Sequence, residues 1–197
     1  MDILDKLFGS RHRIKLLRLF IFNPEDLFSK IEISKRSKVS PPNVRKELNL
    51  FLALKLIKEK TISIKDGAKS KRVKVWQLNP IFPLAQSLRG LLNADFLRQR
   101  AELAKRFKNC GQIKLLVVSG IFISDDDRRL DLLVVGDKLK RPTIDSIVKS
   151  IEADVGRELV YAVLETEEFL YRTGTSDKFI RDVFDYPHER IIDKVPF

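Results

Sequence analysis

The residues best suited to molecular recognition lie just after Ser40. Asn43, Arg45, Lys46 and Asn49 carry amide or cationic side chains within a short segment. Asparagine can form two hydrogen bonds with the edge of adenine, and arginine can do the same with guanine. On one exposed surface, these side chains would be able to read base pairs in the major groove of double-stranded DNA.

A helix is expected to present these side chains. Ser40 can cap free backbone amides, and Pro41-Pro42 suits the first helical turn, where the amides lack intrahelical partners. An apolar stripe at helical spacing leaves the polar side chains on other faces. Its members are Val44, Leu48, Phe51 and Leu52. The alternative interpretation is a solvated helix face without a partner.

Two shorter helices are expected before this one. Apolar residues recur at helical spacing over about 11–22, after a short turn of helix, and Asn23-Pro24 ends the segment because proline cannot continue the hydrogen-bond ladder. A second helix is expected over about 27–36, followed by a tight turn over 37–40. Its inward-facing residues are expected to be Leu27, Phe28, Ile31 and Ile33. Two helices joined in this way are typical of DNA-reading proteins.

A β-hairpin is expected after the third helix. Thr61–Ile64 predicts one strand, and Arg72–Leu78 predicts the returning strand, in which basic and apolar residues alternate. The segment 65–71 is expected to be a turn, with Asp-Gly as its signal. Cations at the tip would contact phosphates beside the groove. They are Lys69, Lys71 and Arg72. The alternative is an exposed hairpin that lysines keep soluble.

The distribution of charge agrees with a polyanionic partner for the first part of the chain. Residues 1–80 contain 19 Lys and Arg against 8 Asp and Glu, a net charge of +11. Residues 81–109 contain 6 against 2, whereas residues 110–197 contain 13 against 17, a net charge of −4. The basic excess therefore lies in the first half, and the second half is expected to do something else.

Residues 1–80 resemble the winged-helix domains of bacterial and archaeal transcriptional regulators. The resemblance runs from Leu7-Phe8-Gly9-Ser10-Arg11 to Leu78-Asn79-Pro80 and lies in the pattern and the order of elements. It implies binding to double-stranded DNA but no particular operator.

Residues 81–109 predict a helical connector. Apolar residues continue at helical spacing over about 84–108, in one long helix or two. The apolar face needs cover, either from the flanking domains or from a second copy of the chain. Cover by a second copy would make the chain a homodimer. This is expected as readily as cover within the chain, because winged-helix proteins commonly read paired half-sites.

Residues 110–197 predict an α/β or α+β domain, which makes the whole chain α+β. Three apolar runs are typical of buried strands, namely Ile113–Gly120, Leu130–Gly136 and Leu159–Leu164. Three helices are expected. The first covers about 142–155, the second begins at Thr166, which is expected to cap it, and the third covers about 176–184.

This second half resembles the minimal nucleotidyltransferase fold. The resemblance lies in Val117–Phe122, Arg129–Asp137 and Tyr161–Phe169. It implies a Gly-Ser pair that contacts nucleotide phosphates, an Asp-x-Asp pair on the second strand and a third carboxylate on the third strand. In active members, the three carboxylates hold magnesium against the triphosphate.

The chain departs from this family at the catalytic positions. Ile121 stands where the family has serine, and Arg129 replaces the first aspartate of the Asp-x-Asp pair. Tyr161–Val163 supply no acid. Asp131 alone cannot hold a divalent ion, which needs several oxygen ligands. We therefore expect no catalytic residue, no metal and no cofactor, although a nucleotide could still bind in the retained cleft.

The loop before the second strand offers no clear substitute for the missing acids. Asp131 is expected near the end of that strand at the mouth of a shallow cleft, where it could bond loop amides or pair with Arg128 or Arg129. Asp125–Asp127 are interpreted as a solvated loop tip. Cys110 is the single cysteine, which excludes an intrachain disulfide and a Cys-rich metal site, and His12 and His188 lie far apart, which argues against a His-ligated metal site.

The sequence as a whole predicts a sequence-specific DNA-binding transcriptional regulator with a non-catalytic sensing or dimerisation domain. Two alternatives stay open. One is an active nucleotidyltransferase that uses an unusual acid set, including Asp131, Asp137 or Glu165. The other is a partner protein of the toxin–antitoxin type. The chain shows no signal-peptide core and no apolar run that could span a bilayer, so a cytoplasmic location without membrane partners is expected.

Overall fold

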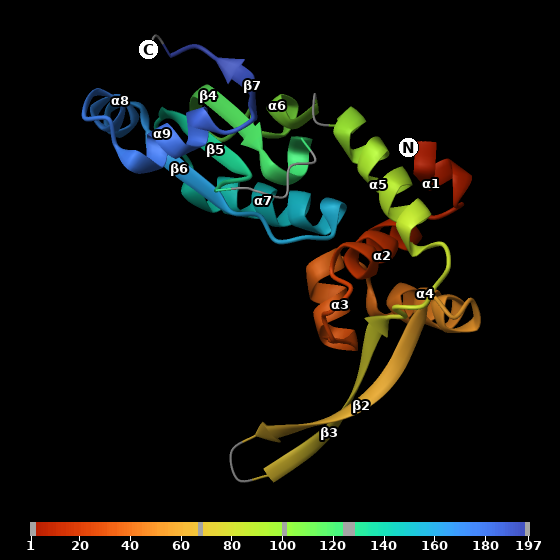
Figure 1. Cartoon of the computed structure of the whole chain (residues 1–197). Coiled ribbons are helices and arrows are strands. Elements are labelled where there is room, and N and C mark those ends of the chain that lie inside the picture. The colour runs from red at the N-terminus through yellow and green to blue at the C-terminus, as the bar shows by residue number, and fades with distance from the viewer. Residues whose placement is uncertain (1–2, 67–68, 100–101, 124–128, 196–197) are drawn as a thin grey trace. The chain divides into compact units, whose positions relative to one another are not determined.

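The computed structural model describes residues 3–66, 69–99, 102–123 and 129–195, and it leaves the side chains of 65, 66, 69 and 95–99 undescribed. The chain is an α+β protein with two separate sheets. It divides into two compact units (Figure 1). The first contains residues 1–95 and 150–157, and the second contains residues 96–149 and 158–197.

The first unit consists of packed helices and a small antiparallel sheet. Its helices are α1 (Ile3–Leu7), α2 (Arg11–Phe22), α3 (Lys30–Ser37), α4 (Pro41–Ala53) and the first part of α5 (Ala85–Gln99). Its strands are β1 (Phe28–Ser29), β2 (Ile57–Asp66) and β3 (Lys69–Leu78), in the order β1-β3-β2. Helices α2, α3 and α4 pack against one another, and the β2–β3 hairpin extends away from them (Figure 1).

Local capping decides where α3 begins. The Ser29 amide donates to the Glu32 carboxylate at 2.7 Å, and the Glu32 amide donates to the Ser29 hydroxyl at 3.3 Å, which forms a capping box. Phe28 and Ser29 pair with β3 instead of joining the helix. The expected helix over 27–36 is therefore a short strand followed by a helix that starts at Lys30.

Two of the four inward-facing residues expected in this region are exposed. Phe28 and Ile33 are buried as predicted, whereas Leu27 is 40% exposed and Ile31 is 81% exposed. Successive helix residues are rotated by about 100°, so Ile31 and Ile33 lie on nearly opposite faces of α3. The expectation was wrong for Leu27 and Ile31 because a helix that starts at Lys30 turns only one of its isoleucines inward.

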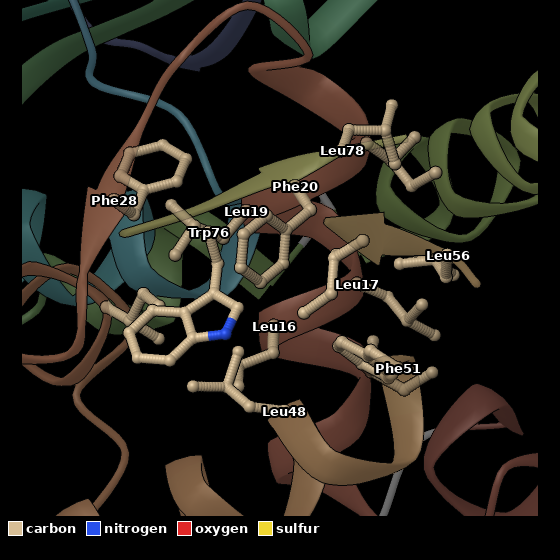
Figure 2. Packing of buried hydrophobic residues seen from close by; sticks show 14 of the residues in the cluster. Leu16, Leu17, Leu19, Phe20, Phe28, Leu48, Phe51, Leu56, Trp76 and Leu78 are labelled. Carbon is tan, nitrogen blue, oxygen red and sulfur yellow. The ribbon is translucent and has the colours of Figure 1, made fainter. Parts of the chain in front are cut away.

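Aromatic side chains form the centre of the first unit. The fully buried ring of Phe20 meets Phe28 and Phe51 edge-on, with ring centroids 5.8 Å and 6.3 Å apart. Edge-to-face contacts of this kind add to the stabilisation from apolar burial. Trp76, near the base of the hairpin, belongs to the same cluster as these rings (Figure 2). The cluster therefore joins α2, α4 and the hairpin into one packed body.

The first unit also includes the C-terminal end of α7 (Arg141–Val155). The Arg18 guanidinium donates to the Asp154 backbone carbonyl at 2.7 Å, and the side-chain amide of Asn23 donates to the Gly156 backbone carbonyl at 2.6 Å. Gly156 has a φ of +75°, and a Cβ there would lie 2.5 Å from the Arg18 backbone. Glycine is therefore required at this close approach.

A mixed four-stranded sheet forms the second unit. Its strands are β4 (Gln112–Ser119), β5 (Leu132–Asp137), β6 (Tyr161–Glu165) and β7 (His188–Asp193), in the order β6-β5-β4-β7. Strand β4 is antiparallel to β5 and β7, and β5 is parallel to β6. The other elements are α6 (Leu103–Arg106), a 3₁₀ turn (Gly120–Ile123), α8 (Thr166–Gly174), α9 (Lys178–Asp185) and the rest of α7.

The three expected strands lie close to their predicted positions, but one strand was not predicted and one helix cap was assigned wrongly. The unpredicted strand is β7, an edge strand that begins at His188 and pairs with β4. Thr166 was expected to cap α8, whereas Glu165 occupies the cap position and Thr166 is the first helical residue. The helical connector contains two helices, α5 and α6. None of the helices in the described ranges is both long and apolar enough to cross a bilayer.

Replacing Phe20 with alanine should destabilise the first unit strongly. Loss of a fully buried aromatic ring, together with the cavity that remains, typically costs about 3–5 kcal/mol of the free energy of unfolding. Urea denaturation followed by the fluorescence of Trp76, the single tryptophan, measures this loss. The control Ile31→Ala removes an exposed side chain and should change stability by less than about 0.5 kcal/mol. Similar losses for both variants would contradict the assignment of the core.

Candidate nucleic-acid interface

Helix α4 separates a buried apolar stripe from an exposed polar face. Val44, Leu48 and Phe51 are buried in the cluster around Phe20, as their spacing predicts. Arg45, Lys46 and Asn49 are exposed on the same helix. The structure therefore brings three of the expected recognition side chains together on an accessible helix surface.

A partly buried ion pair that we did not predict fixes the position of α4. Arg13 Nε donates to Glu47 Oε2 at 2.8 Å, and Arg13 Nη2 donates to Glu47 Oε1 at 3.4 Å. Arg13 also donates to the Phe8 carbonyl at 2.7 Å. The Glu47 side chain is almost fully buried, so it needs this partner. Its spacing of three residues from Val44 and four from Phe51 was the available signal that it lies on the core side of α4.

Ser40 and Asn43 interact with each other at the start of α4. Ser40 occupies the N-cap position, but its side chain makes no capping hydrogen bond. The Ser40 hydroxyl instead accepts a hydrogen bond from Asn43 Nδ2 at 3.0 Å. The expectation that the Ser40 side chain caps the helix was wrong, because the half-exposed Asn43 amide occupies this hydroxyl.

The strands of the β2–β3 hairpin are longer than expected. Asp66 pairs with Lys69, so two residues connect strands of ten residues each. Most of the expected turn over 65–71 is therefore strand. Successive side chains of a strand point to opposite faces, so Lys71 and Arg72 lie on opposite faces of the hairpin. The side chain of Lys69 lies outside the described part of the structure.

The distal half of the hairpin has two chemically different faces. We call one the polar face, and its described side chains are Thr61, Ser63, Ser70, Arg72 and Lys74, all exposed. We call the other the apolar face, and it consists of Ile62, Ile64, Val73 and the exposed Lys71. Alternation along β3 places the polar face on the same side as Trp76, which packs against the helices. The three expected tip cations do not form one cluster.

Several cations of the first unit are free to meet an external anion. Within the described side chains, Arg45, Lys46 and Arg72 have no ion-pair partner. By contrast, Lys74 lies 2.7 Å from Glu59, and Arg36 lies 3.7 Å from Asp26. The one acid of α4 is the buried Glu47, so the exposed face of α4 bears cations and amides without a competing carboxylate. This charge pattern is complementary to a phosphate backbone.

Asp131 in the second unit is a structural carboxylate. It is fully buried directly before β5, and its side chain accepts hydrogen bonds from the amides of Ile121 at 3.1 Å and Val160 at 2.9 Å. Arg129 lies 4.0 Å from Asp182. The expected bonding to backbone amides is confirmed. The expected place at the mouth of a cleft was wrong, because the backbone amides satisfy this carboxylate in the interior.

The other acids considered for catalysis lie at the far end of the strand. Asp137 ends β5 and Glu165 ends the parallel strand β6. A strand of this length spans about 20 Å, whereas metal–oxygen bonds are about 2.0–2.6 Å. Asp131 therefore cannot share a metal ion with Asp137 or Glu165.

Asp137 has a nearby cationic partner in place of a metal ion. The Lys114 ammonium, 2.6 Å away, holds the pKa of the Asp137 carboxyl below its usual value, with help from Thr166. Over the described ranges, no group of three or more His, Cys, Asp and Glu side chains is arranged to hold a metal ion. Asp125–Asp127 and Arg128 lie outside those ranges.

Comparison of the sequence with models of protein families gave no match, and comparison with curated proteins also gave none.

Replacing Glu47 with glutamine should destabilise the first unit, because Arg13 then loses its charged acceptor. Hydrogen bonds to charged groups contribute about 1.5–3 kcal/mol, so the free energy of unfolding should fall by about that amount. The control Glu59→Gln breaks the more exposed pair with Lys74 and should cost less than about 1 kcal/mol. Chemical denaturation of both variants decides the point. A loss for Glu47→Gln no greater than that of the control would show that the pair does not stabilise α4.

Proposed function

We propose that this chain is a sequence-specific, double-stranded-DNA-binding transcriptional regulator, and that its first unit is a winged-helix domain. The observation that carries the proposal is the exposed face of α4. Arg45, Lys46 and Asn49 are available there without a neighbouring acid, while the opposite side of the helix is held by the core. Such a regulator works in the compartment that contains the DNA, which is the cytoplasm in a cell without a nucleus.

In this proposal α3 and α4 form the helix-turn-helix, and α4 enters the major groove. Arg45 and Asn49 are four residues apart and thus share one side of the helix. They supply the donors and the acceptor that read guanine and adenine edges. Lys46 and Asn43 lie beside them and contact phosphates, which positions the helix without reading sequence.

The β2–β3 hairpin acts as the wing through its polar face. Arg72 supplies a charge that pairs with a phosphate, and the hydroxyls of Thr61, Ser63 and Ser70 can donate to phosphate oxygens. The apolar face lacks such a row of donors and carries Ile62, Ile64 and Val73 instead. We therefore assign Arg72, rather than Lys71, to the DNA backbone.

We further propose that the second unit is a non-catalytic, nucleotidyltransferase-like domain that senses a ligand or mediates dimerisation. Burial of Asp131 against two backbone amides supports the absence of metal-dependent transfer, because this carboxylate is already satisfied. The distance of Asp131 from Asp137 and Glu165 argues against an active nucleotidyltransferase that uses these three acids to hold a metal ion. The partners of the regulator are double-stranded DNA and, for reading paired half-sites, a second copy of the chain.

The affinity for double-stranded DNA should fall steeply with salt, because phosphate contacts release counterions. Arg72→Ala should lower the slope of log affinity against log salt by about 1, since one phosphate contact is lost. The matched control Lys71→Ala removes the same charge from the apolar face and should leave the slope nearly unchanged. Titration of labelled duplex DNA at several salt concentrations measures both slopes. Equal slopes for the two variants would show that the polar face does not contact the DNA.

Base reading by α4 is separable from general attraction to DNA. Arg45→Ala or Asn49→Ala should cost about 1–3 kcal/mol on a duplex selected from a random library, and much less on unrelated duplexes. The control Arg181→Ala removes an exposed arginine from α9 in the second unit and should cost nothing on either duplex. Equal losses on selected and unrelated duplexes would show that α4 does not face the bases.

A further inference from the structure

The second unit contains an open cavity that belongs neither to the proposed DNA-binding surface nor to the surroundings of Asp131. Its volume is about 620 Å³, within the range of about 300–1,000 Å³ that is usual for small-molecule sites. The cavity is lined by α6, the segment after it, the start of β4 and the end of β7. Four lysines contribute to the lining, namely Lys105, Lys108, Lys114 and Lys194.

The topology of the second unit brings these lysines together from distant parts of the chain. The Lys194 amide donates to the Lys114 carbonyl at 2.8 Å, which places the end of β7 beside the start of β4. Helix α6 packs against β7. Lys105 and Lys108 flank the buried Phe107, which anchors this segment in the unit. The cluster of lysines therefore follows from the pairing of elements.

The charge of this cavity is unusual for its surroundings. Residues 110–197 carry a net charge of −4, from 13 basic and 17 acidic residues, yet none of the described residues that line the cavity is acidic. Lys105 lies 2.8 Å from Glu102, and Lys114 lies 2.6 Å from Asp137. Among the described residues, Lys108 and Lys194 have no ion-pair partner. Like charges gathered in one concave site repel one another and favour a bound anion.

This cavity is separate from the nucleotide cleft that the resemblance to nucleotidyltransferases implies. That cleft would lie near Gly120 and Asp131, at the end of β4. The cavity lies at the beginning of β4, near Gly111 and Gln112. A strand of eight residues spans about 25 Å, so the two positions are at opposite ends of the sheet.

We propose that this cavity binds a small organic phosphate of about nucleotide size. The ammonium groups of Lys108 and Lys194 pair with the phosphate oxygens, since lysine binds phosphate well as a point charge. Ala104, Ile113 and Ile192 line the cavity with apolar side chains and contact the uncharged part of the ligand. The second unit thus has a ligand site that does not depend on the DNA-binding surface of the first unit.

Isothermal titration calorimetry with metal-free ATP, at low and at moderate salt, tests the site. The intact chain should bind ATP, bind it more weakly as salt increases, and not bind the uncharged nucleoside adenosine. Lys108→Gln/Lys194→Gln should weaken ATP binding about tenfold or more, which is about 1.4 kcal/mol per factor of ten. The matched control Lys149→Gln/Lys178→Gln removes two exposed lysines of the second unit outside the cavity and should change affinity less than about twofold.

Three results would overturn the proposal. The first is no detectable binding of ATP by the intact chain. The second is an equal loss in the cavity variant and the control variant, which would mean that ATP responds to overall charge. The third is a loss of duplex-DNA affinity in the cavity variant without a loss of ATP affinity, which would make these lysines part of a DNA contact. The four substituted lysines are all exposed, namely Lys108, Lys149, Lys178 and Lys194. Circular dichroism should therefore show that both variants keep the fold of the intact chain.

Discussion

The ion pair between the half-buried Arg13 and the buried Glu47 is the constraint on which the proposed DNA-binding surface depends. Glu47 is the one acid of α4, and a carboxylate on the exposed side of that helix would repel phosphates. Its burial against Arg13 removes this charge from the surface and ties α4 to α2. Arg13 also bonds the carbonyl of Phe8, so the same side chain holds the junction between α1 and α2. One arginine thus sets both the orientation of α4 and its electrostatic character.

The hairpin shows how strand geometry separates residues that are neighbours in sequence. Trp76 packs with the helices at the base, and alternation along β3 then carries Arg72 on the same face. Lys71, one residue away, lies with the isoleucines of the opposite face. Arg72 and Lys71 therefore have equal charge but different surroundings. The position of the anchored tryptophan, rather than the number of cations, decides which side of the hairpin is suited to phosphates.

Local signals in the sequence were sufficient to predict several helices and strands. Periodic apolar residues and Asn23-Pro24 predicted α2, Pro41-Pro42 predicted the start of α4, and apolar runs predicted β4 and β5. Non-local pairing was not predictable in the same way. The β1 strand and the edge strand β7 form because β3 and β4 offer free hydrogen-bonding edges, and β7 has little apolar alternation of its own.

Buried polar groups were the hardest part of the candidate site to predict. Glu47 was not among the residues predicted to be buried, although its position relative to the apolar stripe places it on the core side of α4. Asp131 resembled a catalytic remnant, but amides located 10 residues before it and 29 residues after it bind its side chain. The partners of such groups lie far away along the chain, so sequence spacing could not identify them. The exposed set Arg45, Lys46 and Asn49 was predictable because helix geometry alone places it opposite the core.

The most direct test of DNA reading by α4 combines a change in the protein with a change in the DNA. Guanines of the selected duplex are replaced one at a time by 7-deazaguanine, which lacks the N7 acceptor, and binding is measured for the intact chain and for Arg45→Ala. We predict that at one guanine the two changes are not additive, with a coupling energy of about 1–3 kcal/mol, because Arg45 contacts N7 there. Additive losses at every guanine would contradict direct base contact by Arg45.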